Sequence, residues 1–160
     1  MRTPSVSEFQ VAALEFRTFA SRPEPVTERD FPIVRSLLLR LLFHITAVRH
    51  HPHSFEFDGA NLSTEQHTRA RERFQGFPFD SYRIVYDPHD FEGEEPLTAS
   101  LAEDLAGIYC DLAEGLDNWS KGHLEEACFD WAQSYSLHWN RHASSALTAI
   151  EHYLIAHPGT

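Results

Sequence analysis

The sequence predicts an all-α fold, a small helical bundle in which a long C-terminal helix forms an antiparallel hairpin with the helix before it. Three observations lead to this fold class. Apolar residues recur at helical spacing in four segments, capping signals precede three of those segments, and prolines or glycines separate them. Because the chain has 160 residues, a length typical of one core, we expect a single all-helical domain over residues 1–160.

The first helix is expected between Ser5 and the prolines Pro23 and Pro25. Ser5 stands three residues before Glu8, which is the spacing of a capping box. An apolar stripe follows at helical period: Phe9, Ala12, Ala13, Phe16, Phe19 and Ala20. The helix should stop at the two prolines, because neither can continue it.

The second helix is broadly apolar. Thr27 or Asp30 caps its start, and Pro32 is tolerated in its first turn. Its apolar residues cover most of the circumference: Ile33, Val34, Leu37, Leu38, Leu41, Leu42, Ile45 and Val48. Such a helix belongs in the middle of a bundle. It should end by His51 and Pro52, because the residue before a proline avoids helical geometry.

A short polar helix is expected in the middle of the chain, after a loop at residues 53–62. Ser63 and Gln66 have the spacing of a capping signal, and Gly76 closes the helix just after Gln75. The segment predicted to be helical therefore spans only a few turns.

The following segment, residues 77–96, is expected to be an irregular connection. Tyr82, Ile84 and Tyr86 alternate with other residues as in an extended strand. No second segment stands out as a pairing partner, so the sequence does not predict a sheet here.

The last third contains the predicted helical hairpin. Ser100 and Glu103 form a second capping box, and apolar residues recur behind it at spacings of four and three: Leu101, Leu105, Ile108, Leu112, Leu116 and Trp119. Residues 120–122 form a tight turn. A long helix is then expected from about His123 to Ala156, without proline or glycine and with one apolar face: Leu124, Cys128, Trp131, Tyr135, Trp139, Ala146, Ala149 and Tyr153.

Composition excludes several classes of function. The chain has 13 Lys and Arg against 24 Asp and Glu, a net charge of −11 at pH 7, and its pI is near 5.4. Because the phosphates of nucleic acid repel such a charge, we expect no nucleic-acid partner. No Gly-rich phosphate loop, nucleophile elbow or calcium loop is present, and no cofactor is assigned.

The compartment expected from the sequence is the cytoplasm. The apolar run from Leu37 to Phe43, interrupted by Arg40, is far shorter than the roughly 18 residues of a membrane span, so no membrane partner is expected. The first 21 residues lack the apolar core of a secretory signal. Two cysteines, Cys110 and Cys128, do not make a disulfide framework in a chain of this length.

One polar cluster is predicted inside the helical hairpin. At 100° per residue, His138 and His142 both fall on the apolar stripe of the long helix. Asp104 and Asp111 flank the stripe of the preceding helix, about 60–80° from its centre. Pairing the two helices around the turn places Asp104 level with His138 and Asp111 level with Trp131. We therefore expect Asp104 to join the two histidines, and Asp111 to accept the indole N–H of Trp131.

Two chemistries fit this cluster. In the structural interpretation, Asp104 accepts from an imidazole, and the group satisfies its own hydrogen bonds inside the bundle. In the functional interpretation, His138, His142 and Asp104 are three metal ligands that leave a position open for water. A two-histidine spacing on a helix favours the structural interpretation unless further ligands accompany it.

The last third also resembles a known family. The stretch EPLTASLAEDLAGIY at residues 95–109 is similar to an uncharacterised bacterial family, the domain of unknown function numbered 5063. GHLEEA at residues 122–127, Trp131 and HWNRHA at residues 138–143 strengthen the resemblance, which is good over 95–155 and loose over the first two helices. The resemblance implies a small, mostly helical, soluble bacterial protein, and it carries no activity, cofactor or catalytic residue.

Two functions follow from these observations. The first is a non-enzymatic interaction or accessory module with a protein partner, since no catalytic set stands out. The second is a metal-dependent enzyme or sensor that uses His138, His142 and Asp104. The first should bury its polar cluster and expose a partner surface, whereas the second needs a cavity that reaches the histidines. Oligomeric state and substrate do not follow from the sequence.

Overall fold

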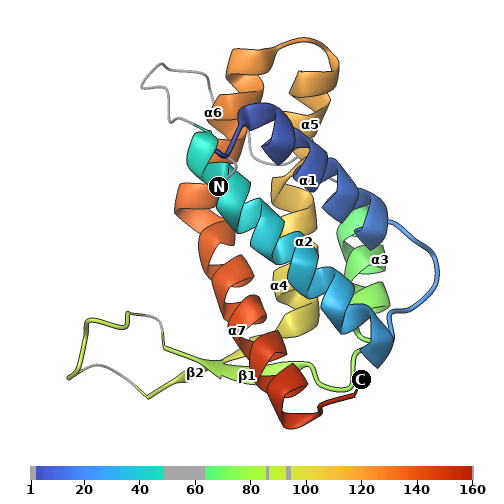
Figure 1. Ribbon diagram of the computed structural model, residues 1–160, viewed down its shortest axis with the longest axis vertical. Helices are drawn as coiled ribbons and strands as arrows, with labels where there is room; N and C mark the ends of the chain where they lie inside the picture. The colour runs from blue at the N-terminus through green and yellow to red at the C-terminus, as the bar shows by residue number, and fades with distance from the viewer. Residues whose placement is uncertain (1–2, 49–63, 86, 93–94, 160) are drawn as a thin grey trace.

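The helical bundle is confirmed by a computed structural model that describes residues 3–48, 64–85, 87–92 and 95–159 (Figure 1). Helices dominate it, and one small two-stranded sheet lies across one end. Its elements are α1 (Val6–Ala20), α2 (Phe31–His44), α3 (Thr64–Phe74), β1 (Ser81–Ile84), β2 (Leu97–Ser100), α4 (Leu101–Asp111), α5 (Ala113–Ser120), α6 (Leu124–Ser134) and α7 (Asn140–Ala156). Short 3₁₀ turns lie at Glu28–Asp30 and Ile45–Ala47, and a π-helical turn lies at Tyr135–Trp139.

The start of α1 follows the sequence prediction. The Ser5 hydroxyl accepts from the Glu8 amide at 3.3 Å and donates to the Glu8 carboxylate at 2.9 Å. The whole expected stripe of α1 is buried: Phe9, Ala12, Ala13, Phe16, Phe19 and Ala20. The Ser5 cap and the stripe therefore position this helix as its local sequence requires.

Helix α2 lies on the outside of the bundle rather than in its middle. Val34, Leu38 and Leu41 are fully buried, but Ile33 and Leu39 are each 45% exposed. The central helix is instead α4, which packs against α1, α3 and α7. The expected end of α2 at His51 and Pro52 falls outside the described residues.

The connection after α3 contains a β-hairpin that the sequence did not predict. Strands β1 and β2 pair antiparallel from Ser81 opposite Ser100 to Ile84 opposite Leu97. Asp80, just before β1, accepts from the Ser100 hydroxyl and from the Ala102 amide, each at 2.9 Å. The sheet was missed because β2 is only four residues long, its last residue Ser100 is already the cap of α4, and the segment has no strand pattern of its own.

The C-terminal hairpin is present, but both of its arms are interrupted. The first arm breaks at Leu112 into α4 and α5, and the second contains the π-helical turn between α6 and α7. Helix α5 packs on α6 and α4 packs on α7, so the arms are antiparallel as expected (Figure 1).

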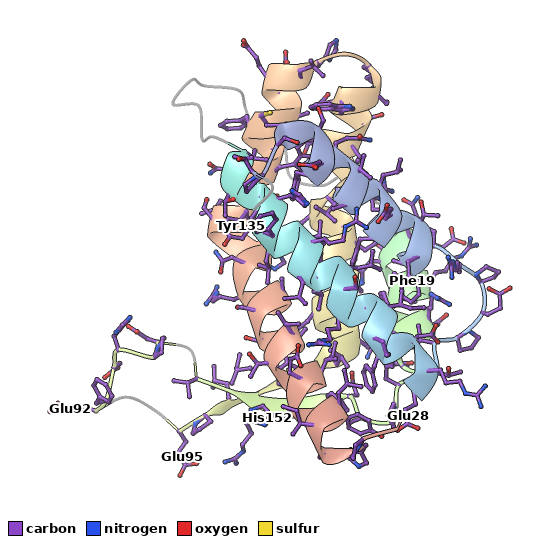
Figure 2. All side chains as sticks on the ribbon, in the orientation of Figure 1. Phe19, Glu28, Glu92, Glu95, Tyr135 and His152 are labelled. Carbon is purple, nitrogen blue, oxygen red and sulfur yellow. The ribbon has the colours of Figure 1, made fainter. Side chains whose placement is uncertain are left out.

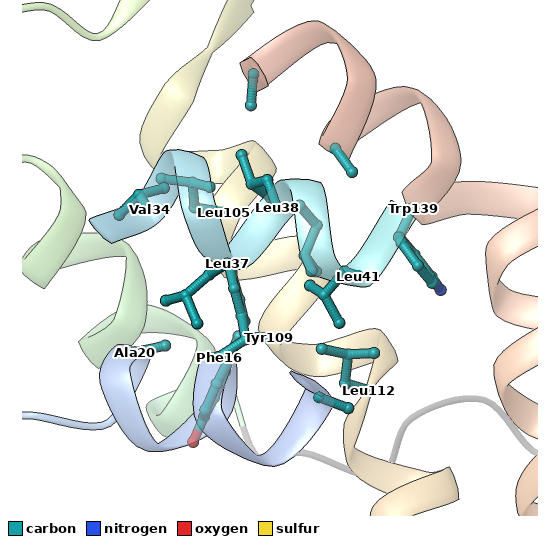
Figure 3. Close-up of a cluster of buried hydrophobic side chains, with 14 of the residues drawn as sticks. Phe16, Ala20, Val34, Leu37, Leu38, Leu41, Leu105, Tyr109, Leu112 and Trp139 are labelled. Atoms are coloured by element: carbon teal, nitrogen blue, oxygen red, sulfur yellow. The ribbon is translucent and has the colours of Figure 1, made fainter. Parts of the chain in front are cut away.

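The hydrophobic core lies where α1, α2, α4 and α7 meet (Figure 3). Its largest fully buried side chains include Phe9, Phe16, Trp131 and Trp139. The Phe9 ring lies edge-on to Trp131 at 5.0 Å and is stacked near Trp139 at 6.2 Å, measured between centroids. The core thereby anchors the long C-terminal arm both before the π-helical turn and within it.

Candidate functional site

A π-helical turn positions the two histidines of the candidate site. The backbone N–H of Asn140 reaches the carbonyl of Tyr135, five residues earlier. The Asn140 side-chain amide also donates to this carbonyl at 2.7 Å and to that of Ser136 at 3.2 Å, so the carbonyls displaced from the α-helical pattern are satisfied. His138 lies within this turn and His142 in the first turn of α7. Such turns recur at functional sites of proteins.

The site is a chain of hydrogen bonds that runs from α4 to the π-helical turn and back. His142 Nδ1 lies 2.6 Å from Asp104 Oδ1, and His138 Nδ1 lies 2.5 Å from Asp111 Oδ2. The Nε2 atoms of the two histidines face each other at 3.0 Å. The other oxygen of Asp104 accepts from the Tyr82 hydroxyl on β1.

The structure brings together all three residues that the sequence analysis singled out, but in a different register. Asp104 is bonded to His142. The sequence had placed Asp104 level with His138, which lies one helical turn earlier in the chain. The prediction for Asp111 was wrong: it bonds to His138, and the Trp131 indole donates to the Leu112 carbonyl at 3.4 Å. The π-helical turn and the break at Leu112 change which residues of the two arms lie opposite each other, because the prediction assumed two regular helices.

Tyr82 is the site residue that sequence reasoning missed. Its alternation with Ile84 indicated an extended segment, but the site became visible only once β1 was paired with β2 and placed beside α4. Burial raises the pKa of Tyr82, and the hydrogen bond to Asp104 raises it further. Tyr82 therefore acts as a donor to Asp104.

The carboxylates decide which nitrogen of each ring carries hydrogen. An ionised carboxylate only accepts, so each Nδ1 donates to its aspartate. In two neutral rings, both Nε2 atoms would then be acceptors, and the two lone pairs would face each other at 3.0 Å. A cation at the two Nε2 atoms, either a proton or a metal ion, removes this repulsion.

Asp104 is buried and Asp111 is mostly covered, whereas the imidazoles reach solvent. The side chains of Asp104 and Asp111 are 8% and 15% exposed, against 29% for His142 and 52% for His138. Burial raises the pKa of Asp111, and the hydrogen bond from His138 opposes the shift. The cluster is thus open on its histidine side, unlike a polar group enclosed in a core.

A groove beside α7 reaches this cluster. It has a volume of about 530 Å³ and is lined by Asp104, His142 and Arg141 together with side chains of the β-hairpin. It shares lining residues Ile84 and Val85 with a second, more apolar groove of about 800 Å³ further along α7. Each groove by itself is of the size that small-molecule sites have in proteins.

The cluster supplies two metal-ligating nitrogens. Within the part of the chain that the structure describes, no group of three or more His, Cys, Asp or Glu side chains could hold a metal ion. Both oxygens of Asp104 are already engaged, one with His142 and one with Tyr82. Asp104 therefore orients a histidine rather than standing free as a third ligand.

The cysteines offer no nucleophile. Burial raises the pKa of the Cys110 thiol to about 11, with the charge of Asp111 adding to the shift. Burial also raises the pKa of Cys128. Both thiols are free and partly buried, and the unreactive thiol form is favoured at neutral pH.

The family of the chain is shown by comparison with family models. The model described as a domain of unknown function, DUF5063, matches residues 34–157. The chain belongs to the DUF5063 family. The match includes both histidines and both aspartates of the cluster, and it begins well before the stretch at residues 95–155 where the resemblance was good.

A solved structure shares the fold of this DUF5063 chain. It is the crystal structure of protein BF1032 from Bacteroides fragilis, with a TM-score of 0.74 and 17% sequence identity. The alignment covers 97% of this chain and 94% of that chain. No curated protein matches the sequence, so the comparisons indicate no specific function. In the described residues, no helix is both long enough and apolar enough to cross a membrane.

Proposed function

We propose that this DUF5063 protein binds a divalent transition-metal ion through the Nε2 atoms of His138 and His142. The observation that carries the proposal is the convergence of these two nitrogens at 3.0 Å on a solvent-accessible side of the bundle. Imidazole nitrogen is a preferred ligand of zinc, copper, nickel and iron. The remaining coordination positions are open to water or to a ligand in the groove.

The spacing of the nitrogens suits one ion. With Zn–N bonds of about 2.0–2.1 Å in tetrahedral geometry, two ligand nitrogens lie roughly 3.3 Å apart. The separation of 3.0 Å between the Nε2 atoms needs to widen by only a few tenths of an ångström. His138 is half exposed, so a small rotation of its ring meets little resistance.

The aspartates give each ring the partner that metal-bound histidines usually have. A ligating histidine almost always donates its other ring N–H to a carboxylate, a carbonyl or water. Asp104 accepts from Nδ1 of His142 and Asp111 from Nδ1 of His138. This contact fixes the ring orientation and leaves Nε2 as the free donor atom for a metal.

The test is a zinc titration of the untagged full chain after removal of metal with a chelator. We expect saturable binding of one Zn²⁺ per chain by calorimetry, and a Co²⁺ complex with the visible spectrum of a nitrogen-ligated ion. His138→Ala and His142→Ala should each lose this binding. His152→Ala is the matched control, because His152 is an exposed histidine further along α7 and should leave binding unchanged (Figure 2).

Two further variants test the role of the carboxylates. Asp104→Asn and Asp111→Asn keep both imidazoles but lose the charged acceptor on Nδ1. We expect each to weaken Zn²⁺ binding by about 10- to 100-fold. Equal Zn²⁺ affinity in the wild type, His138→Ala and His142→Ala would contradict the proposal, since the bound metal would then lie elsewhere.

An interaction or accessory module is the second candidate. Apolar side chains on and next to the β-hairpin favour it, because Val85 is 61% exposed and Leu97 is 46% exposed. It becomes the leading function if neither the wild-type protein nor any variant binds metal and His142→Ala lowers stability markedly. The histidines would then share a proton within a structural cluster.

The setting that we propose is the cytoplasm of a bacterium, with residues 1–160 forming one domain. The two unpaired cysteines support the cytoplasm, and the bacterial source of the solved structure with the same fold supports a bacterial host. The net charge of −11 supports a protein without a nucleic-acid partner.

A further inference from the structure

A separate pocket lies on the other side of the bundle, where the end of α1 faces α3. It has a volume of about 650 Å³, and its polar lining includes Arg22, Arg69, Arg73 and Tyr109. Glu72 is the one acidic residue among those that line it. In a chain with a net charge of −11, this local excess of positive charge is unusual.

Arg73 is a buried cation, and within the described part of the chain no carboxylate forms a direct salt bridge with it. It is 6% exposed, and its Nε atom has no hydrogen-bond partner. Its guanidinium lies 4.7 Å from the ring centroid of Phe19, and that of Arg22 lies 5.3 Å from the same ring. Figure 2 shows Phe19 at the end of α1, beside α3. Two like charges thus lie against one aromatic ring.

Nearby acidic groups offset the burial of the Arg73 charge only in part. Burial lowers the pKa of Arg73, Asp30 and Glu24 oppose the shift, and the charge of Arg22 adds to it. Asp30 instead accepts from the backbone and hydroxyl of Thr27. A buried charge without a close partner is costly. An anionic ligand that pairs with Arg73 would remove this cost, so its binding should be favourable.

Backbone contacts hold together the segments that form the pocket. The Val26 amide donates to the Arg73 carbonyl at 3.1 Å, which fastens the connection between α1 and α2 to the end of α3. Pro23 and Pro25 restrict the backbone of that connection. A Cβ on Gly76 would overlap the Val26 carbonyl, so the close approach of these segments depends on glycine.

We propose that this pocket binds an oxyanion of the phosphate type, either as inorganic phosphate or as the phosphate group of a small metabolite. The guanidinium fork matches the geometry of phosphate oxygens, and Arg22 and Arg73 present two such forks. The volume leaves room beyond the phosphate for the body of a small molecule. This site is independent of the histidine pair, since the two share no residue.

Calorimetric titrations of the metal-free full chain with inorganic phosphate and with adenosine 5′-monophosphate test the proposal. We expect saturable binding of at least one probe and a rise in Tm with probe concentration. Tighter binding of the monophosphate would show that the ligand is a phosphate ester, and equal affinity would show that phosphate alone is recognised. Each result supports the anion site.

Three variants make the test specific. Arg22→Ala and Arg73→Met should each weaken binding about tenfold or more, because each removes a charged donor. Arg73→Met should also raise the Tm of the ligand-free protein, since an apolar side chain replaces an unpaired buried charge. Arg83→Ala, on β1 and outside this pocket, is the matched control and should bind as the wild type does.

The outcomes against the proposal are equally clear. Absence of saturable binding to both probes overturns it. Undiminished binding in Arg22→Ala and Arg73→Met also overturns it, because the anion would then bind to another positive surface. Zinc binding by the histidine pair is unaffected in either case, so the two proposals fail separately.

Discussion

Tyr82 and Asp111 show how single residues acquire roles from their neighbours. Each is an ordinary polar residue in the sequence, but Tyr82 donates to Asp104 and Asp111 accepts from His138. The histidine spacing of four residues was enough to predict that both rings share a face. It was not enough to predict which carboxylate each ring would meet, because that depends on the register of two interrupted helices.

Asp130 provides a pH-dependent prediction at the residue scale. It is 4% exposed on α6 and accepts from the Asn118 amide on α5 at 2.7 Å. Burial raises the pKa of Asp130 above its usual 3.8, the Asn118 hydrogen bond opposes the shift and Glu126 adds to it. The folded state therefore holds this proton more tightly than the unfolded state, and stability is lost as pH rises through the raised pKa.

Asp130→Asn should remove this loss. We expect the free energy of unfolding of the variant, relative to the wild type, to rise with pH from about 3.8 and then level off. Urea denaturation of both proteins from about pH 3 to about pH 8 measures the difference. If the free energies of unfolding of the two proteins change with pH in parallel, burial does not destabilise the ionised Asp130 carboxylate, which would contradict this prediction.

At the scale of elements, the interruptions of the C-terminal hairpin matter most. The sequence predicts a continuous helix after residue 122, because nothing in its composition marks a π-helical turn. The turn adds one residue to the helix and so changes which face α7 presents relative to α6. Trp131 before the turn and Trp139 within it both become fully buried, and the two histidines face α4.

Insertion of one alanine after Leu137 tests the register of the two segments that the π-helical turn joins. Leu137 is 59% exposed, so the change disturbs few contacts locally, but the turn already holds one extra residue and a second one rotates α7 by about 100° relative to α6. We expect a loss of about 3 kcal/mol or more in stability, together with loss of Zn²⁺ binding. Leu137→Ala is the control and should stay within about 0.5 kcal/mol of the wild type.

Two glycines on the first arm of the hairpin should respond oppositely to alanine. A Cβ on Gly115 would overlap the indole of Trp131, so Gly115→Ala should cost about 1–3 kcal/mol through overpacking. A Cβ on Gly107 would meet its nearest atom, Cε1 of His138, at 3.7 Å, an ordinary contact. Gly107→Ala should therefore gain up to about 1 kcal/mol from helix propensity, as measured by chemical denaturation. Equal effects of the two changes would contradict this packing.

At the scale of the whole molecule, charge distribution separates two regions of the surface. The net charge of −11 describes the chain as a whole, but the pocket beside α3 gathers three arginines with one glutamate. Glu92 and Glu95, by contrast, lie on the segment that joins the two strands, away from the bundle (Figure 2). An overall charge therefore argues against a large anionic partner such as nucleic acid without excluding a small anion at one pocket.

Solubility should have a sharp minimum near pH 5.4, the pI of the sequence. Protonation of the 11 histidines would offset the net charge of −11 as pH falls toward this value. Turbidity and residual soluble concentration across the acid range measure the effect. A minimum at a clearly different pH would indicate that many histidines titrate away from their usual range.

The sequence by itself determined the helical class, the first cap, the apolar stripe of α1 and the face shared by His138 and His142. These features depend on residues a few positions apart, so local periodicity is enough to predict them. Only the tertiary structure decided the β-hairpin, the aspartate partner of each histidine, and the placement of Arg22 and Arg73 in one pocket beside Phe19. Those contacts join segments far apart in the chain, and for the histidines the extra residue of the π-helical turn also changes which residues of the two arms face each other.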